Sequence, residues 1–192
     1  MKKKKKNPRR IPMPKSQIDY NSILEEATKD DMYRAWLLIA SNLIELEYVS
    51  PTQVGTLADQ INKQIGAKQF KSNDYEIRRI ERLIGVSNPY DNLDISQVKS
   101  TFDLEKFKKK VERVAIHTSL CVIGFGLDAS SEFSAEQLRR LFLNVDLTLA
   151  EIDAGCTTYK ALENGLAEKN MMIQVVDNND CTEVLVQNDL DK

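Results

Sequence analysis

The side chains best suited to chemistry in this chain are a histidine and a cysteine one helical turn apart. His117 is the single histidine of the sequence, and Cys121 follows four residues later, so the two would share one face of a helix. An imidazole beside a thiol can activate a nucleophile or supply two ligands to zinc. A structural zinc site needs four ligands, and the sequence contains neither a CxxC nor an HxxxH pattern to supply the others. We therefore interpret the pair as part of the core.

Other motifs that would indicate an enzyme are incomplete. Gly124-Phe125-Gly126 is too short for a dinucleotide-binding loop, which requires GxGxxG between a strand and a helix. The oxygen-rich segment 177–183, DNNDCTE, lacks the central glycine and the bidentate glutamate of a calcium loop. Paired carboxylates such as Glu25 and Glu26 are typical of solvated helix faces. We expect no catalytic residue, no cofactor and no bound metal, and hence a protein that is not an enzyme.

Basic residues form a more informative pattern. The candidate contacts for nucleic acid or for a protein partner lie at the N-terminus and in a predicted third helix: Lys2, Lys3, Lys4, Lys5, Lys6, Arg9, Arg10, Arg78, Arg79 and Arg82. A lysine-rich stretch, residues 106–110, also opens a predicted long helix. Such side chains can bind phosphates through contacts that weaken as salt rises. The alternative, that charges on an outer helical face are only solvated, stays open.

The net charge of −2 conceals a strong asymmetry along the chain. Residues 1–15 hold eight of the 27 basic residues and none of the 29 acidic ones. This segment contains three prolines and few apolar side chains, so burial cannot offset the entropy lost on ordering. We predict a disordered basic arm over residues 1–15, whose nucleic-acid binding is modest because the rest of the chain is acidic.

Length and composition indicate a globular protein of the cytoplasm. A chain of 192 residues with 42% hydrophobic content can bury a core. No uninterrupted apolar stretch is long enough for a membrane span, and no apolar region follows the basic N-terminus as in a secretory signal. Three widely spaced cysteines, Cys121, Cys156 and Cys181, favour reduced thiols. We expect no membrane partner.

Helical periodicity over residues 16–172 predicts an all-α fold. The first helical unit, residues 16–86, should contain a capped helix and a short third helix. Before them, residues 17–47 form either one helix or two helices broken near residues 28–31. The capped helix starts at the capping box Ser50-x-x-Gln53 and is expected to stop near Gly66.

The second helical unit, residues 101–172, repeats this plan. Its long helix is expected to loosen at Gly124 and Gly126, and a second capping box follows at Ser134. A constant shift of 84 residues aligns three landmarks of the two units without a gap: Ser50 with Ser134, Gln53 with Gln137, and Tyr75 with Tyr159. We interpret the fold as two similar three-helix units that arose by internal duplication. The alternative is that any two capped amphipathic helices align equally well.

Two segments lie outside these units. Residues 87–100 are interpreted as a linker, because SNPYDN is rich in turn-forming residues and contains a proline. Residues 173–192 form either an acidic tail or a small β-hairpin, since two apolar stretches flank the turn sequence DNND.

The opening segment KKKNPRRIPMPKSQID resembles the start of a group of small proteins carried by phages and prophages of Firmicutes. Those proteins begin with a lysine-rich NPRR-x-P segment followed by a helix. The matching residues of this chain are Asn7, Pro8, Arg9, Arg10, Pro12 and Asp19. The resemblance implies a mobile-element origin and assigns no site residues.

Together these observations favour a non-catalytic, phage- or mobile-element-encoded interaction protein. We expect it to bind a protein partner in the host cytoplasm and to regulate or inhibit host machinery, such as a defence system; a homo-oligomer is compatible with this. The alternative is a DNA-binding regulator that uses the basic arm and the arginine-rich third helix.

Overall fold

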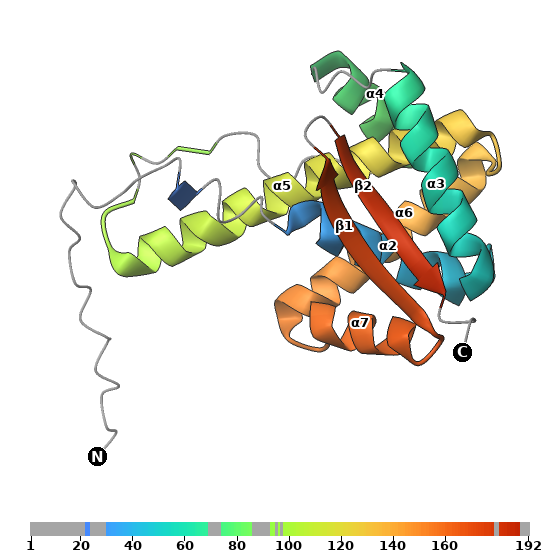
Figure 1. The fold of residues 1–192 in the computed structure, drawn as a ribbon. Helices are drawn as coiled ribbons and strands as arrows, with labels where there is room; N and C mark the ends of the chain where they lie inside the picture. The colour runs from blue at the N-terminus through green and yellow to red at the C-terminus, as the bar shows by residue number, and fades with distance from the viewer. Residues whose placement is uncertain are drawn as a thin grey trace.

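The computed structural model of this chain describes residues 22–23, 30–68, 74–85, 93–94, 96, 98–178 and 181–188. Within them the chain forms six helices and one C-terminal β-hairpin (Figure 1). The elements are α2 (Asp31–Glu45), α3 (Pro51–Lys68), α4 (Asp74–Ile84), α5 (Thr101–Ser130), α6 (Ala135–Ala154), α7 (Tyr159–Ala167), β1 (Met171–Asn178) and β2 (Cys181–Asn188). The predicted all-α fold with a small C-terminal hairpin is confirmed. The basic arm and most of the predicted linker lie outside the described residues.

Helix α5 is the longest element, and the predicted loosening at its two glycines is wrong. The helix continues without a break for 30 residues, from Thr101 to Ser130. A Cβ added at Gly124 would lie 3.2 Å from the side chains of both Ile80 and Phe142, and one at Gly126 would overlap the side chain of Ile61. The glycines therefore mark places where neighbouring helices approach the α5 backbone, not places where the helix ends.

The two predicted capping boxes differ in their hydrogen bonds. At the start of α6, Ser134 Oγ accepts from Gln137 N at 3.2 Å while Gln137 Oε1 accepts from Ser134 N at 2.9 Å, which is the complete box. At the start of α3, Gln53 Oε1 accepts from Ser50 N at 2.8 Å and from Ser50 Oγ at 2.9 Å. Helix α3 extends two residues beyond the predicted stop at Gly66, to Lys68.

One hydrophobic core draws side chains from both predicted units. Helix α5 packs against α2, α3 and α4, and α2 packs against α6 and α7. The first unit contains α2, α3 and α4, and the second contains the corresponding helices α5, α6 and α7. The contact of α3 with α5 therefore corresponds to that of α6 with α2, and the contact of α4 with α5 corresponds to that of α7 with α2. Each predicted unit thus packs mainly on the other.

The C-terminal hairpin lies across the helices as a separate layer (Figure 1). Its strands pair antiparallel, from Met171 with Asn188 to Asn178 with Cys181. Strand β1 contacts α2 and α7, and β2 contacts α3. Met171 and Ile173 are buried, whereas Met172 and Gln174 are exposed, as the alternation of a strand requires. An isolated hairpin is marginal in water, so this docking supplies the burial that the strands need.

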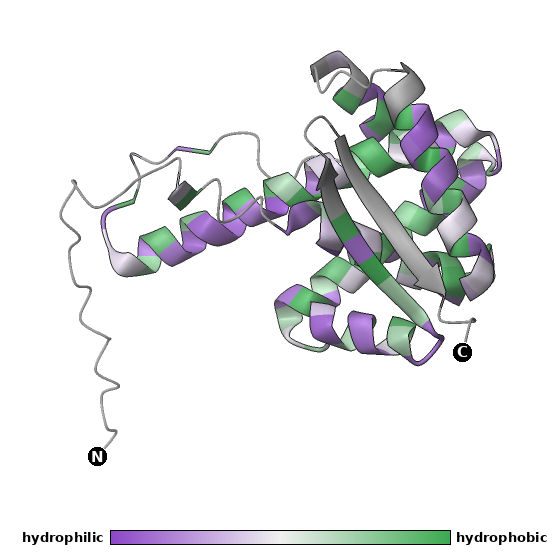
Figure 2. Cartoon of the chain, in the orientation of Figure 1, coloured by the Kyte–Doolittle hydropathy of each residue, from purple (hydrophilic) through white to green (hydrophobic). Residues whose placement is uncertain are grey.

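The N-terminal half of α5 projects beyond the main helical bundle (Figure 1). A second, smaller cluster, which we call the satellite cluster, covers its apolar side. It is formed by the buried Ile23, Phe107 and Val111 with partly buried side chains that include Leu93 and Val98. The other side of this projecting half is hydrophilic over much of its length (Figure 2).

None of the helices in the described part of the chain is long and apolar enough to cross a membrane.

The close crossing of α3 and α5 predicts opposite effects for two glycine substitutions. Gly126→Ala should lower the free energy of unfolding by about 1–3 kcal/mol, because the new methyl group overlaps Ile61 and stands 3.3 Å from its carbonyl oxygen. Gly165→Ala in α7, where nothing lies within 4 Å of the added Cβ, should raise it by about 0.5–1 kcal/mol through helix propensity. Urea unfolding followed by circular dichroism measures both. Equal effects would contradict the crossing.

Candidate functional site

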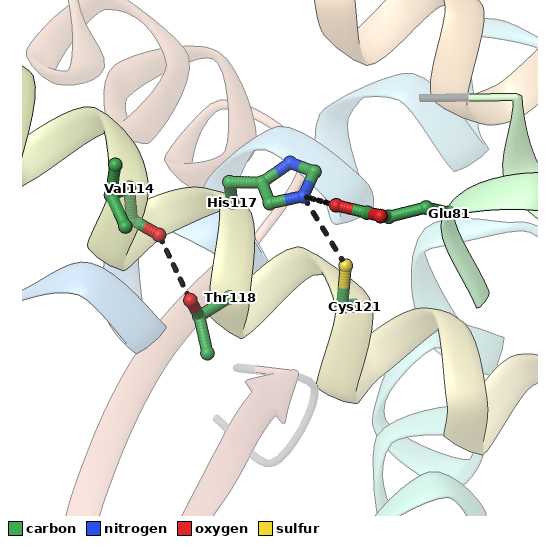
Figure 3. Close-up of polar contacts among 5 residues, drawn as sticks. All are labelled: Glu81, Val114, His117, Thr118 and Cys121. Atoms are coloured by element: carbon green, nitrogen blue, oxygen red, sulfur yellow. Dashed lines mark hydrogen bonds and ion pairs between the residues drawn. The ribbon is translucent and has the colours of Figure 1, made fainter. Parts of the chain in front are cut away.

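The histidine and cysteine singled out in the sequence lie together in a buried polar cluster (Figure 3). His117 and Cys121 come from adjacent turns of α5, and Glu81 reaches them from α4. The Nε2 atom of His117 lies 2.8 Å from Glu81 Oε1 and 3.7 Å from Cys121 Sγ. The His117 side chain is 6% exposed and the Glu81 side chain 16%. Sequence spacing predicted the pair, but the carboxylate, 36 residues away, was not identified.

The cluster does not have the geometry of an activated thiol. An ionised carboxylate can only accept hydrogen bonds, so Nε2 carries the proton that it donates to Glu81. That nitrogen therefore cannot act as the base that removes the proton of Cys121. Burial, and then the charge of Glu81, raise the pKa of Cys121 to about 12, so its thiol stays protonated at neutral pH. The cluster serves as a polar link between α4 and α5.

Further polar contacts join α2 to the second half of the chain. Ser119 Oγ donates to Asp31 Oδ2 at 3.0 Å, and Asn42 Nδ2 donates to Thr148 Oγ1 at 3.2 Å. Burial raises the pKa of Asp31, while its hydrogen bond from Ser119 opposes the rise. Among the described residues, every buried side-chain nitrogen and oxygen has a hydrogen-bond partner. These contacts position helices and leave no unsatisfied group directed at a ligand.

An arginine at the start of α2 makes two contacts with the second half of the chain. Arg34 forms an ion pair with Glu112 of α5, and its guanidinium lies 5.2 Å from the centroid of the Tyr159 ring on α7. Burial raises the pKa of the Tyr159 hydroxyl, whereas the positive charges of Arg113 and Arg34 lower it. The arginine thus links three helices, and nothing in its geometry requires a bound anion.

The structure separates the three arginines predicted as contacts in the third helix. Arg79 turns toward α5, with its guanidinium 3.3 Å from Asp128 Oδ2 and 5.9 Å from the centroid of the Phe125 ring. Arg78 and Arg82 are exposed. Arg79 is therefore paired with α5 while its side chain stays 40% exposed, and the other two arginines are exposed for a partner. The arm residues Lys2–Lys6, Arg9 and Arg10 lie outside the described residues.

The outer side of the projecting half of α5 carries an aromatic and basic stripe, which we call the α5 stripe. It is formed by residues at four- and three-residue spacing on one helical face: Phe102, Lys106, Lys109 and Arg113. Phe102 is 53% exposed, and Lys106 Nζ lies 4.5 Å from the centroid of its ring. Arg113 Nη2 lies 2.7 Å from Asp153 Oδ2 of α6. The sequence showed the lysines, but only the structure shows that they project.

A second exposed feature, on α6, was missed in the sequence. Leu143 is 61% exposed and Leu147 is 56% exposed, and both lie outside the spacing of the residues that α6 buries. The buried side of α6 is formed by Leu138, Leu141, Phe142, Val145 and Leu149. The sequence signal that could have revealed this feature was the number of apolar residues in α6. A helix with one buried face does not need two further leucines outside that face.

The comparisons with known proteins identify no relative. No protein-family model, no curated protein and no solved structure matches this chain. Among the described residues, no group of three or more His, Cys, Asp or Glu side chains is arranged to hold a metal ion.

The different environments of the two described cysteine side chains predict selective alkylation. Cys156 is exposed, whereas Cys121 is buried with its pKa raised to about 12. Iodoacetamide at neutral pH should modify Cys156 of the native protein within minutes and leave Cys121 unmodified until urea unfolds the chain. Peptide mass spectrometry distinguishes the sites. Rapid modification of native Cys121 would instead indicate an accessible thiolate.

The hydrogen bond between Glu81 and His117 predicts a measurable coupling energy. A double-mutant cycle with Glu81→Leu and His117→Leu should give a coupling of about 1–2 kcal/mol in urea unfolding, because both groups are withdrawn from water. The matched control is the pair Arg113 and Asp153, whose carboxylate is 63% exposed and should couple by less than about 1 kcal/mol. A coupling no larger than the control's would contradict the structural role.

Proposed function

We propose that this chain is a non-catalytic interaction protein that binds an acidic protein partner through the α5 stripe. The observation that carries the proposal is the exposure of Phe102 beside Lys106 on a helix that projects from the bundle. We further propose that the protein is encoded by a phage or mobile element and regulates or inhibits host machinery in the cytoplasm. That part is supported by the resemblance of the opening segment.

The chemistry of the α5 stripe suits a protein surface. Aromatic side chains supply much of the binding energy at interface centres, and long basic side chains contribute apolar stems as well as charge. The satellite cluster around Phe107 and Val111 fixes the orientation of the helix, so little of its backbone must be ordered on binding. A partner that fits would present carboxylates around an apolar recess for Phe102.

Two features favour a protein over a nucleic-acid backbone at this surface. Glu105 is exposed on the projecting half of α5 near Lys106 and Lys109, so the positive charge is interrupted. Outside residues 1–15 the chain holds 19 basic against 29 acidic residues, because eight of the 27 basic residues are in the arm. This excess of acid opposes the dense, continuous charge of a phosphate backbone more than a protein surface that carries carboxylates only around one apolar recess. The alternative, a DNA-binding regulator, is favoured by the exposure of Arg78 and Arg82 one turn apart on α4.

Variants on the two surfaces distinguish these functions. Phe102→Ala combined with Lys106→Glu should reduce capture of the host partner at least about tenfold, a loss of about 1.4 kcal/mol. Arg78→Ala combined with Arg82→Ala is the matched control and should leave capture unchanged. Quantitative pull-down from host lysate, followed by titration of the identified protein, measures both.

Deletion of residues 2–10 provides the complementary measurement. We expect it to remove non-specific nucleic-acid binding at low salt while partner binding is retained, since the α5 stripe is intact. Binding of a defined DNA sequence at physiological salt that the deletion or the α4 double variant abolishes would replace the proposed function by the DNA-binding regulator.

A further inference from the structure

Helix α6 has a second apolar face that points away from the core, which we call the α6 face. It consists of exposed residues that recur at four-, three- and four-residue spacing: Leu143, Leu147, Ala150 and Ala154. This is the spacing of the apolar seam between two helices of a coiled coil. The core already occupies the opposite side of α6, through residues such as Phe142 and Val145. A helix that packs on its bundle from one side needs only one apolar face, so the second is unexplained by the fold.

We propose that the α6 face pairs with the α6 face of a second copy of this chain, with the two helices antiparallel. The charges along the face decide the direction. Arg139 and Arg140 directly precede the leucines, after Glu136, and Glu151 follows them, all exposed. In the antiparallel pair Glu136 lies level with the partner's Ala154, whereas Arg140 lies beside the partner's Glu151. A parallel pair would bring like charges to the same level, whereas an antiparallel pair brings opposite charges together.

The antiparallel register follows from the leucines. If Leu143 lies opposite Leu147 of the partner copy, the two-fold axis passes midway between these positions, at the level of Val145. Arg140 then lies level with the partner's Ala150, beside the partner's Glu151. The methyl group of an alanine leaves room for the stem of the arginine, whose guanidinium can reach the carboxylate.

One unfavourable contact and the size of the face limit the strength of the dimer. Asp146 lies close to the axis, so its carboxylate faces the same carboxylate of the partner copy. The positive charge of Arg113 offsets part of this repulsion. It lowers the pKa of Asp146, although burial raises that pKa by more. Helix α6 has 20 residues and is therefore about 30 Å long. One helix face of this length is smaller than the ~800 Å² per partner of a standard interface. We expect a micromolar dimer that closes at two copies.

This inference is independent of the partner proposed above, because the α6 face does not include Phe102, Lys106 or Lys109. A dimer would present two copies of the α5 stripe and increase avidity for a repeated or symmetric partner. Since self-association is measured on the purified chain alone, its failure leaves the proposed function to be judged by its own experiment.

Sedimentation velocity of the full-length protein from about 1 to 200 µM tests the dimer. We expect a concentration-dependent shift from monomer to dimer. Leu143→Glu with Leu147→Glu should abolish the shift with unchanged circular dichroism, whereas Phe102→Ala, a matched exposed apolar residue on α5, should leave it intact. A monomer at every concentration, or a dimer that survives the double variant, would overturn the proposal.

A charge exchange tests the register without altering the leucines. Arg140→Glu should weaken the dimer at least about tenfold, because two symmetric attractive pairs become repulsive. Adding Glu151→Arg to the same chain restores opposite charges across the axis and should recover most of the affinity. Weakening without recovery would contradict the antiparallel register.

Discussion

The architecture depends on the close approach of three helices to the backbone of α5. Gly124 admits Ile80 and Phe142 from α4 and α6, and Gly126 admits Ile61 from α3. A side chain at either position would push the neighbouring helix outward and open the core between the two halves of the chain. The 30-residue helix can therefore act as a continuous support on which both halves assemble.

The same packing explains why the residues with chemical potential are structural. Glu81 lies one residue after Ile80, so the approach of α4 to α5 also brings its carboxylate to His117. Once the imidazole donates to that carboxylate, the neighbouring thiol has no base, and burial together with the charge of Glu81 keeps it protonated. The contact links two helices through groups that would be costly to bury alone.

The outer surfaces are set by the elements that the core leaves free. The first half of α5 extends beyond the bundle and is held by the satellite cluster around Phe107 and Val111, so its basic side is presented at a fixed orientation. Helix α6 packs its broad buried side on α2 and α4, which leaves Leu143 and Leu147 in solvent. Two separate surfaces, one basic and aromatic and one apolar with charges at its ends, are thus available for binding.

The sequence by itself determined the local structure. Apolar periodicity and the capping residues Ser134 and Gln137 predicted the helices, because these signals act over a few residues. The apolar stretches around DNND indicated the hairpin as one of two alternatives for the C-terminal segment. Spacing likewise placed His117 and Cys121 on one face. Local signals failed at Gly124 and Gly126, where low helix propensity indicated a break that tertiary packing overrides.

Only the tertiary structure decided which distant residues meet. It brought Glu81 to His117, paired Arg79 with Asp128, and left Arg78 and Arg82 exposed. It also showed that the two halves share one core and that α6 carries two apolar faces. These outcomes depend on how helices cross and on which side each one buries, and amphipathic patterns specify the existence of a buried face but not the neighbour that covers it.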